Sequence, residues 1–206
     1  ETLSCVDCMV RNCEFRNSMY PDFCLTTDLT EDQVVEVLEL YGEEENHKAM
    51  CAAAEVECEG YLKKCRVEEI MMFAEKIGAK KLGIATCVGL LRESRTLAKI
   101  LRSHGFEVYG AACKVGSIPK TEVGIDAKCE EIGKYMCNPI LQAKLLNEAK
   151  TDLNLVVGLC VGHDSLFYKY SEALTPTVVT KDRVLGHNPA AALYTAESYY
   201  KRLMEK

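Results

Sequence analysis

Cysteines that follow short apolar runs are the residues of this chain best placed to do chemistry. The runs LGIAT, FEVYGAA and LNLVVGL are typical of buried strands, and the residues that follow them are Cys87, Cys113 and Cys160. A glycine turn comes soon after each cysteine. Because the carboxyl ends of parallel strands meet at one crevice, where such folds bind ligands, we expect these three thiols at one site.

Two further segments bring metal-binding side chains to the same predicted edge. Cys137 and His187 each stand before an Asn-Pro pair, which is a favoured start for a helix. His163 follows Cys160 at a predicted strand-to-helix junction. Thiolates and imidazoles bind zinc, and thiolates also hold iron–sulfur clusters. We therefore expect a second centre that holds zinc or an iron–sulfur cluster, with the ligands Cys87, Cys113, Cys137 and Cys160.

The same edge also permits thiol chemistry. Cys87 and Cys160 stand close to predicted helix starts, where backbone N–H groups and the helix dipole lower the pKa of a thiol. A thiol or redox enzyme would use Cys160 or Cys87 as the nucleophile and His163 as the base. His187 is a further candidate for acid–base catalysis. If a metal at this edge keeps an open coordination position, a small sulfur-containing molecule would be a suitable substrate. Two alternatives stay open. The protein could be a non-catalytic module for metal handling or sensing, or the thiols could simply be buried as small apolar groups.

A separate cysteine set lies near the amino terminus, with the spacing C-x2-C-x4-C-x10-C. A C-x2-C pair can bring both sulfurs to one ion, and two later cysteines complete the tetrahedral shell that structural zinc prefers. An iron–sulfur cluster would suit the same count. The segment is too polar to fold by packing, so a metal would supply its folding energy. We expect a metal knuckle over residues 1–28, with zinc as the expected ion, held by Cys5, Cys8, Cys13 and Cys24.

Three more cysteines recur every seven residues, at Cys51, Cys58 and Cys65. This spacing puts them on one stripe of a helix if the helix is continuous. Such a stripe is more often part of a core than a site, so we expect buried thiols.

The elements that position these residues change in character along the chain. The first part reads as a helical lead-in over residues 30–78, with a capping box at Thr30–Gln33 and helices at 30–40, 46–61 and 67–76. Over residues 81–206 strands alternate with helices, which is the signature of a parallel sheet. The predicted strands are 82–86, 107–112, 153–159 and 177–180, and the predicted helices are 90–104, 140–149, 165–170 and 190–204. The expected fold is a three-layer, Rossmann-like α/β domain over residues 29–206, with a short parallel sheet.

Composition excludes several classes of function. The net charge is -6 and the basic residues are scattered, which argues against a nucleic-acid partner. No apolar run approaches the roughly 20 residues of a membrane-spanning helix, and the start ETLSCVDC does not resemble a signal peptide. We therefore expect a soluble, cytoplasmic protein without a membrane partner. A reducing compartment disfavours stable disulfides, so the 12 cysteines point to metal ligation, redox chemistry or burial.

Several long motifs resemble one known family. They are RVEEIMMFAEKIGAKKLGIATCVGL, CKVG, MCNPILQAKLLNEAKTDLNLVVGLCVGHDS and VTKDRVLGHNPAAALY. With the amino-terminal cysteines, they resemble a prokaryotic family of uncharacterised, cysteine-rich proteins that is labelled metal-binding and has a domain of unknown function. The resemblance covers nearly the whole chain and implies the same knuckle, but no reaction. The second-centre residues that fall inside the family motifs are Cys87, Cys113, Cys137, Cys160, His163 and His187.

Overall fold

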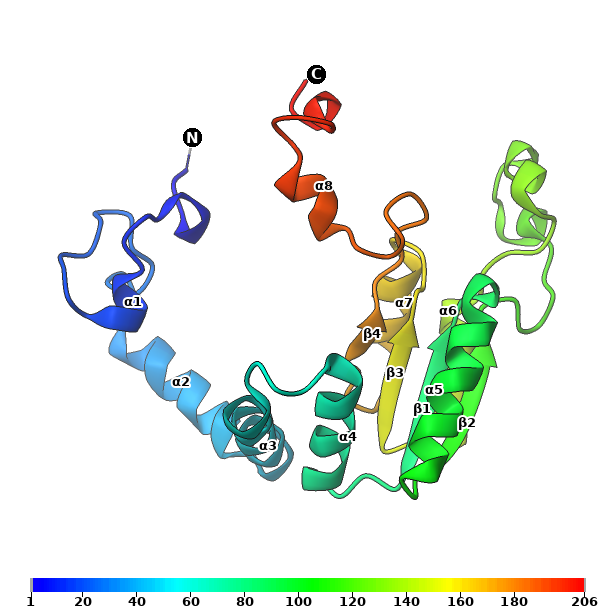
Figure 1. Cartoon of the computed structure of the whole chain (residues 1–206), viewed down its shortest axis with the longest axis horizontal. Coiled ribbons are helices and arrows are strands. Elements are labelled where there is room, and N and C mark those ends of the chain that lie inside the picture. Colours follow the sequence, from blue (N-terminus) through cyan, green and yellow to red (C-terminus); the bar gives the residue numbers. More distant parts are fainter. Residues whose placement is uncertain (1, 206) are drawn as a thin grey trace. The chain divides into compact units, whose positions relative to one another are not determined.

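A four-stranded parallel sheet in the order β2-β1-β3-β4 carries the predicted cysteine edge (Figure 1). The strands are β1 (Lys81–Thr86), β2 (Glu107–Ala112), β3 (Leu153–Val157) and β4 (Thr177–Val179). Helix α5 (Leu91–Ser103) links β1 to β2, while α6 (Pro139–Glu148) and α7 (His163–Tyr170) follow β2 and β3. This computed structural model describes residues 2–205 and confirms the predicted Rossmann-like α/β class.

Side chains alternate between two apolar layers, one on each face of the sheet. Leu82 and Ile84 of β1 pack in one layer with side chains of α4 (Arg66–Lys76) and α5. Ala85 packs in the other layer with side chains of α6 and α7. The inner strands β1 and β3 are buried along almost their whole length and read as nearly continuous apolar runs, whereas the outer strands β2 and β4 are more exposed.

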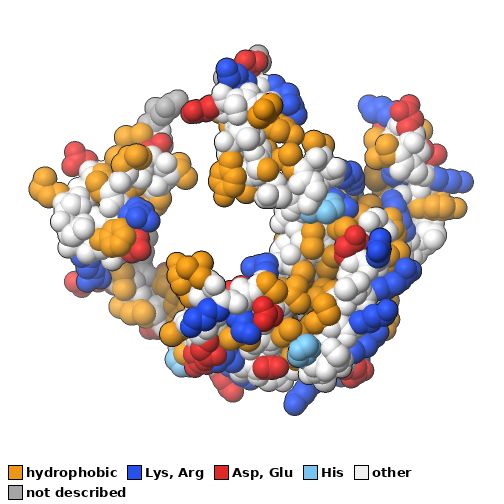
Figure 2. Space-filling model, in the orientation of Figure 1, with side chains coloured by type: hydrophobic (Ala, Val, Ile, Leu, Met, Phe, Trp, Pro, Cys, Tyr) orange, Lys and Arg blue, Asp and Glu red, His pale blue; other side chains and the backbone are white. Residues whose placement is uncertain are grey.

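Helix α5 shows how the outer layer is built. Its Leu97 and Leu101 are buried, and each buried leucine contributes about 2 kcal/mol by leaving water. Its exposed side chains include Arg92, Arg95, Lys99 and Arg102. Figure 2 shows basic side chains gathered over this helix.

The chain divides into two units, Glu1–Glu55 and Val56–Lys206. The first contains the 3-10 helix η1 (Cys5–Asp7), α1 (Asn12–Phe15), α2 (Glu31–Gly42) and the first part of α3 (Glu44–Gly60). The predicted capping box of α2 is present, since the Thr30 hydroxyl accepts from the Gln33 N–H and the Gln33 side chain accepts from the Thr30 N–H. Among the described residues, no helix is long and apolar enough to cross a membrane.

The prediction that Cys51, Cys58 and Cys65 are buried is wrong, because all three are exposed. The stripe is not continuous, since α3 ends at Gly60 and Cys65 lies just before α4. The buried residues of α3 are Ala52, Val56 and Gly60, so Ala52 lies one position from Cys51 and Val56 lies two positions from Cys58. A seven-residue repeat shows which residues share one face of a helix, but it does not show whether that face packs against another element.

The predicted last helix is also shorter than expected. Helix α8 runs only over Ala190–Tyr194, and a short 3-10 helix, η5, follows at Lys201–Leu203. Leu193 is 74% exposed and Tyr194 is 85% exposed, so this helix has little packed surface to extend it. The Thr195 hydroxyl, which donates to the Ala191 carbonyl, lies at its end.

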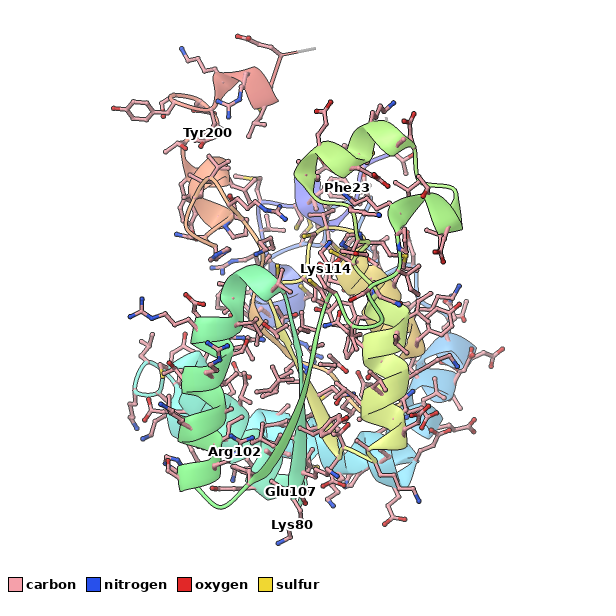
Figure 3. The ribbon with its side chains drawn as sticks, turned by 90° about the vertical axis from the view of Figure 1, so that its right-hand side faces the viewer. Phe23, Lys80, Arg102, Glu107, Lys114 and Tyr200 are labelled. Carbon is pink, nitrogen blue, oxygen red and sulfur yellow. The ribbon has the colours of Figure 1, made fainter. Side chains whose placement is uncertain are left out.

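A loop arm leaves the carboxyl edge of the sheet between β2 and α6. It contains the 3-10 helices η3 (Lys120–Val123) and η4 (Ala127–Ile132), and its base is closed by an antiparallel bridge between Pro119 and Tyr135. Figure 3 shows Lys114, at the start of this arm, at the opposite end of the sheet from Lys80 and Glu107.

One fully buried side chain, Gln142 of α6, joins the segments that carry the cysteines. Its Nε2 donates to the Thr86 carbonyl at 3.1 Å and to the Ala111 carbonyl at 2.7 Å. Its Oε1 has no hydrogen-bond partner within residues 2–205. Thr86 directly precedes Cys87, so this amide fixes the backbone on which the predicted site stands.

Replacing Gln142 by Glu should make stability strongly pH-dependent. A buried carboxylate would face the carbonyl oxygens of Thr86 and Ala111, so the folded chain should favour the protonated acid and raise its pKa above the unfolded value of about 4.3. Stability is then lost as the pH rises from the unfolded toward the folded pKa, by up to about 1.4 kcal/mol per pH unit. Urea unfolding between about pH 4 and pH 8, relative to the parent chain, measures this loss. The exposed Lys144→Glu variant on the same helix is the control, and parallel pH profiles for the two variants would contradict the expectation.

Candidate metal centre

Strand register places Cys87 and Cys113 next to each other. In the β1–β2 pair, Thr86 lies opposite Ala112, and each cysteine is the residue that follows. The Cys113 N–H continues the ladder by donating to the Thr86 carbonyl at 2.8 Å. Both thiols are buried in the apolar layer that α6 and α7 cover. Adjacent strands lie about 4.8 Å apart, which is close enough for the two sulfurs to meet.

Cys137 reaches the same place from the end of the loop arm. The N–H of the next residue, Asn138, donates to the Cys113 carbonyl at 2.7 Å. The Asn138 side chain accepts from the Leu141 N–H at 3.1 Å, and Pro139 is the first residue of α6. The predicted Asn-Pro helix start is therefore confirmed, and it fixes Cys137 against the apolar layer.

The thiols of Cys87, Cys113 and Cys137 form a hydrogen-bonded row with Cys113 in the middle. The hydrogen bond from Cys113 is the main cause that lowers the pKa of Cys87, and it also lowers the pKa of Cys137. The same contacts, first with Cys137 and then with Cys87, raise the pKa of Cys113. Within the row these contacts favour the thiolate form of Cys87 and Cys137 and the protonated form of Cys113.

His163 lies at the end of this row, beside Cys137. The hydrogen bond with the Cys137 thiolate raises the pKa of His163, and the imidazole is the second cause, after Cys113, that lowers the pKa of Cys137. His163 is the first residue of α7, and its N–H donates to the Cys160 carbonyl at 2.9 Å. Its Nδ1 is buried and has no hydrogen-bond partner in the described part of the chain.

Cys160 lies at the same edge but outside the row. Strand β3 ends at Val157 because Gly158 turns with φ +63°, where a Cβ atom would lie 2.1 Å from Leu90 Cδ1. The predicted strand over 153–159 would end directly before Cys160. The observed strand ends at Val157, so Cys160 lies three residues beyond it. Its sulfur accepts from Arg183 Nη2 at 2.9 Å. That hydrogen bond raises the pKa of Arg183, and the charges of Cys87 and Cys137 add to the effect.

Basic side chains that the sequence reading missed surround the sulfurs. A Gly89 N–H and the Lys181 ammonium both lower the pKa of Cys87, after the larger effect of Cys113. The charge of Lys114 contributes in the same direction to the pKa of Cys137. Lys181 and Arg183 lie within four residues of the end of β4, in the KDR run. The carboxyl ends of parallel strands meet at one edge, so the argument used for the cysteines also predicts these two residues there.

His187 is not part of the sulfur row. It lines a separate cavity with Arg66 and Glu93. Its Nδ1 accepts from the Asp182 N–H at 3.1 Å. The structure thus brings Cys87, Cys113, Cys137 and His163 into contact, holds Cys160 beside Arg183, and places His187 in another part of the same unit.

The sulfur row has the ligand type that a soft metal prefers, but its side chains are not arranged as a metal shell. Thiolates are the ligands that zinc, copper(I) and iron–sulfur clusters prefer. Within residues 2–205, no three Cys, His, Asp or Glu side chains already stand at the mutual distances of a metal shell. Because Cys137 and Cys87 raise the pKa of Cys113, a metal bound to all three sulfurs would have to displace the Cys113 proton.

The four amino-terminal cysteines line one small cavity of about 100 Å³. Asn12 closes the loop beside them, because its Oδ1 accepts from the Ser18 N–H and its Nδ2 donates to the Ser18 carbonyl. Arg11 and Arg16 have left-handed backbones, with φ of 47° and 51°. Such backbones cost roughly 1–3 kcal/mol each and persist only where the surroundings hold them.

Comparison with known proteins confirms the resemblance to an uncharacterised family. The family described as "Protein of unknown function (DUF1847)" matches residues 24–178. This range includes all members of the sulfur row but ends before His187. An uncharacterised protein of Methanocaldococcus jannaschii is 48% identical over 178 residues, which cover 86% of this chain and 91% of that protein.

Among solved structures, a crystal structure of Dph2 from Pyrococcus horikoshii with a 4Fe-4S cluster is similar to 68% of this chain, at 20% identity and a TM-score of 0.37. The chain spans about a third of the length of that structure, since it covers 33% of it, and a likeness at this level carries no functional argument. The family match and the archaeal relative decide the assignment: this chain belongs to the DUF1847 family of proteins of unknown function.

Proposed function

We propose that this protein binds metal at two thiolate centres, one at the amino terminus and one at the carboxyl edge of the sheet. The observation that carries the proposal is the contact of Cys87, Cys113 and Cys137, which three separate segments bring together. Burial of isolated thiols would not require three of them to meet, nor cations to stand beside them.

The charge balance of the edge supports a metal there. Two thiolates next to one shared proton form an anionic site, and a metal that replaces the proton of Cys113 would complete a three-sulfur set. Lys181, Arg183 and Lys114 lie close enough to the sulfurs to offset the remaining negative charge. Zinc and an iron–sulfur cluster both suit this set.

Three protein ligands leave a coordination position open, as in catalytic rather than structural metal sites. A metal bound there would supply a Lewis acid, and a small sulfur-containing molecule is a chemically suitable ligand for it. His163 is placed to hold or donate a proton beside Cys137, and Arg183 keeps Cys160 at the edge as a further thiol.

For the amino-terminal set we propose a structural metal site. The four cysteines line one cavity, and the residues around it bury almost no apolar side chain that could hold the loop together. Metal–thiolate bonds would supply the restraint that the left-handed backbones of Arg11 and Arg16 need. Zinc is the expected ion because it favours closed shells of four thiolates.

A second candidate function is thiol–disulfide exchange, which the contact of Cys137 with His163 favours. The Cys137 thiolate would attack one sulfur of a small disulfide, forming a mixed disulfide and releasing the first thiolate. Cys113 would pass its proton to the thiolate released first and attack the sulfur of Cys137, which releases the second thiolate and leaves a Cys113–Cys137 disulfide. The substrate is reduced by two electrons and the protein is oxidised by two. Incubation of metal-free protein with glutathione disulfide and peptide mapping tests this, because protein that keeps both thiols would exclude the exchange.

Protein purified without oxygen should contain both metal centres. We expect the paired change Cys87→Ser and Cys137→Ser to remove the metal of the second centre only, since it deletes two of its three sulfurs. The paired change Cys5→Ser and Cys8→Ser should remove the metal of the amino-terminal centre only. Elemental analysis, acid-labile sulfide and the visible spectrum measure the content and distinguish zinc from an iron–sulfur cluster.

The exposed pair Cys51→Ser and Cys58→Ser is the matched control, because it removes two thiols from α3 without touching either centre. It should keep the full metal content. Metal that is insensitive to Cys87 and Cys137 would rule out the second centre and leave the first intact.

In metal-free, reduced protein, Cys113→Ala should raise the pKa of both Cys87 and Cys137. The change removes the thiol whose hydrogen bonding lowers the pKa of each of the two sulfurs, so their pKa values should move toward the ordinary value of about 8.5. In the parent chain the two thiolates persist as the pH falls through that value, whereas in the variant they take up protons there. Ultraviolet absorbance of the thiolate, followed against pH, reports the difference. Cys129→Ala, in the loop arm, is the control, and identical titration curves for the two variants would refute the shared-proton row.

A further inference from the structure

A cavity of about 510 Å³ lies beside β4, and the proposed metal centres do not use it. Its apolar wall is formed by Leu90 together with Val178 and Val179 of β4. Its charged and imidazole side chains come from three other places in the fold: Arg66 at the start of α4, Glu93 of α5 and His187 of the loop after β4. A cavity of this size is typical of sites for small molecules.

Arg66 and Glu93 bring opposite charges to this cavity without neutralising each other. Arg66 Nε donates to the Thr177 carbonyl at 2.6 Å, which fixes the guanidinium against the edge strand and leaves its terminal nitrogens for a ligand. Neither Arg66 nor Glu93 takes part in an ion pair among the residues that the structure describes. Two unpaired charges of opposite sign at one cavity suit a ligand that itself carries both.

His187 adds a hydrogen-bond donor of fixed identity. Because its Nδ1 accepts from the Asp182 N–H, the proton of the neutral ring must be on Nε2. The ring is held by a compact loop, in which the His187 N–H donates to the Asp182 carbonyl at 2.8 Å and Asp182 Oδ1 accepts from the N–H groups of Val184 and Leu185.

The backbone of His187 is strained, with φ at 66°. A non-glycine residue in this region costs roughly 1–3 kcal/mol, and such residues cluster at active sites and ligand clamps. The loop thus maintains an unfavourable backbone at the residue whose imidazole lines the cavity.

We infer that this cavity binds a small aliphatic α-amino acid. The carboxylate of the ligand pairs with Arg66 and accepts from His187 Nε2–H, and its ammonium group pairs with Glu93. Its apolar side chain packs on Leu90, Val178 and Val179. This site does not rest on the metal centres, so it stands whether or not the sulfur row holds a metal.

Titration calorimetry and ligand-observed NMR with L-leucine and L-methionine test the site on the whole chain. Two analogues of leucine separate the charges: 4-methylpentanoate lacks the ammonium group and 3-methylbutylamine lacks the carboxylate. The amino acids should bind at least about tenfold tighter than either analogue, since each loses a charge pair. Equal affinity for an amino acid and an analogue, or no binding of any probe up to about 10 mM, would overturn the inference.

Variants assign the charges. Glu93→Gln should abolish the preference for leucine over 4-methylpentanoate, and Arg66→Gln should abolish the preference over 3-methylbutylamine. Arg95→Gln, on the same helix as Glu93 but lining a different cavity, should keep both preferences. Because Arg66 also bonds to β4, thermal unfolding of each variant accompanies the titrations. Because Glu93 is exposed, Glu93→Gln should fold and still test the site if Arg66→Gln unfolds. Unchanged ligand preferences in Glu93→Gln would refute the proposed pose.

Discussion

The two hydrogen bonds from the Gln142 amide to the ends of β1 and β2 are the constraint on which the cysteine edge depends. They run from a helix that begins directly after Cys137 to the strands that precede Cys87 and Cys113. One buried side chain therefore sets the relative position of all three sulfur-bearing segments. Because its own Oε1 is left without a partner among residues 2–205, this position is held at some cost in stability.

At the proposed second metal centre, a metal would compete with the proton of Cys113 for the three sulfurs. Hydrogen bonding within the fold lowers the pKa of Cys87 and Cys137, which favours the thiolate form that a metal needs. The basic residues that follow β4 offset the charge that results. Thiolates with low pKa values and nearby cations would suit either a soft metal or the electrophilic sulfur of a disulfide. Metal binding and thiol–disulfide exchange are therefore proposed for the same residues.

The sequence was most informative where a local pattern marks an element, whether the element is buried, as β3 is, or largely exposed, as β2 is. The strands and the helices α5 and α6 lie close to their predicted bounds because continuous apolar runs and helix caps are local signals. Those same signals predicted that Cys87, Cys113 and Cys137 meet. The position of Cys160 was harder to predict from the sequence. It depends on the turn at Gly158 and on the side chain of Leu90, which is remote in sequence.

Other features lay beyond local patterns. The exposure of the cysteine stripe on α3 and the early end of α8 depend on which surfaces find a partner, and periodicity does not contain that information. The role of Gln142 also has no sequence signal, since a glutamine in a helix reads as a solvated residue until its burial is known. The separation of His187 from the sulfurs follows from the course of the loop after β4.

The distances along the chain between the cysteines imply an order of assembly. Cys5 to Cys24 lie within one short segment, so an ion could gather them before anything else has formed. Cys87, Cys113 and Cys137 are joined by a crossover helix and a long arm, and they meet only when β1, β2 and α6 are already in place. The proposed first site would therefore bind its metal during folding. The proposed second site would bind its metal only after the sheet has formed, so its loading would be separate from folding.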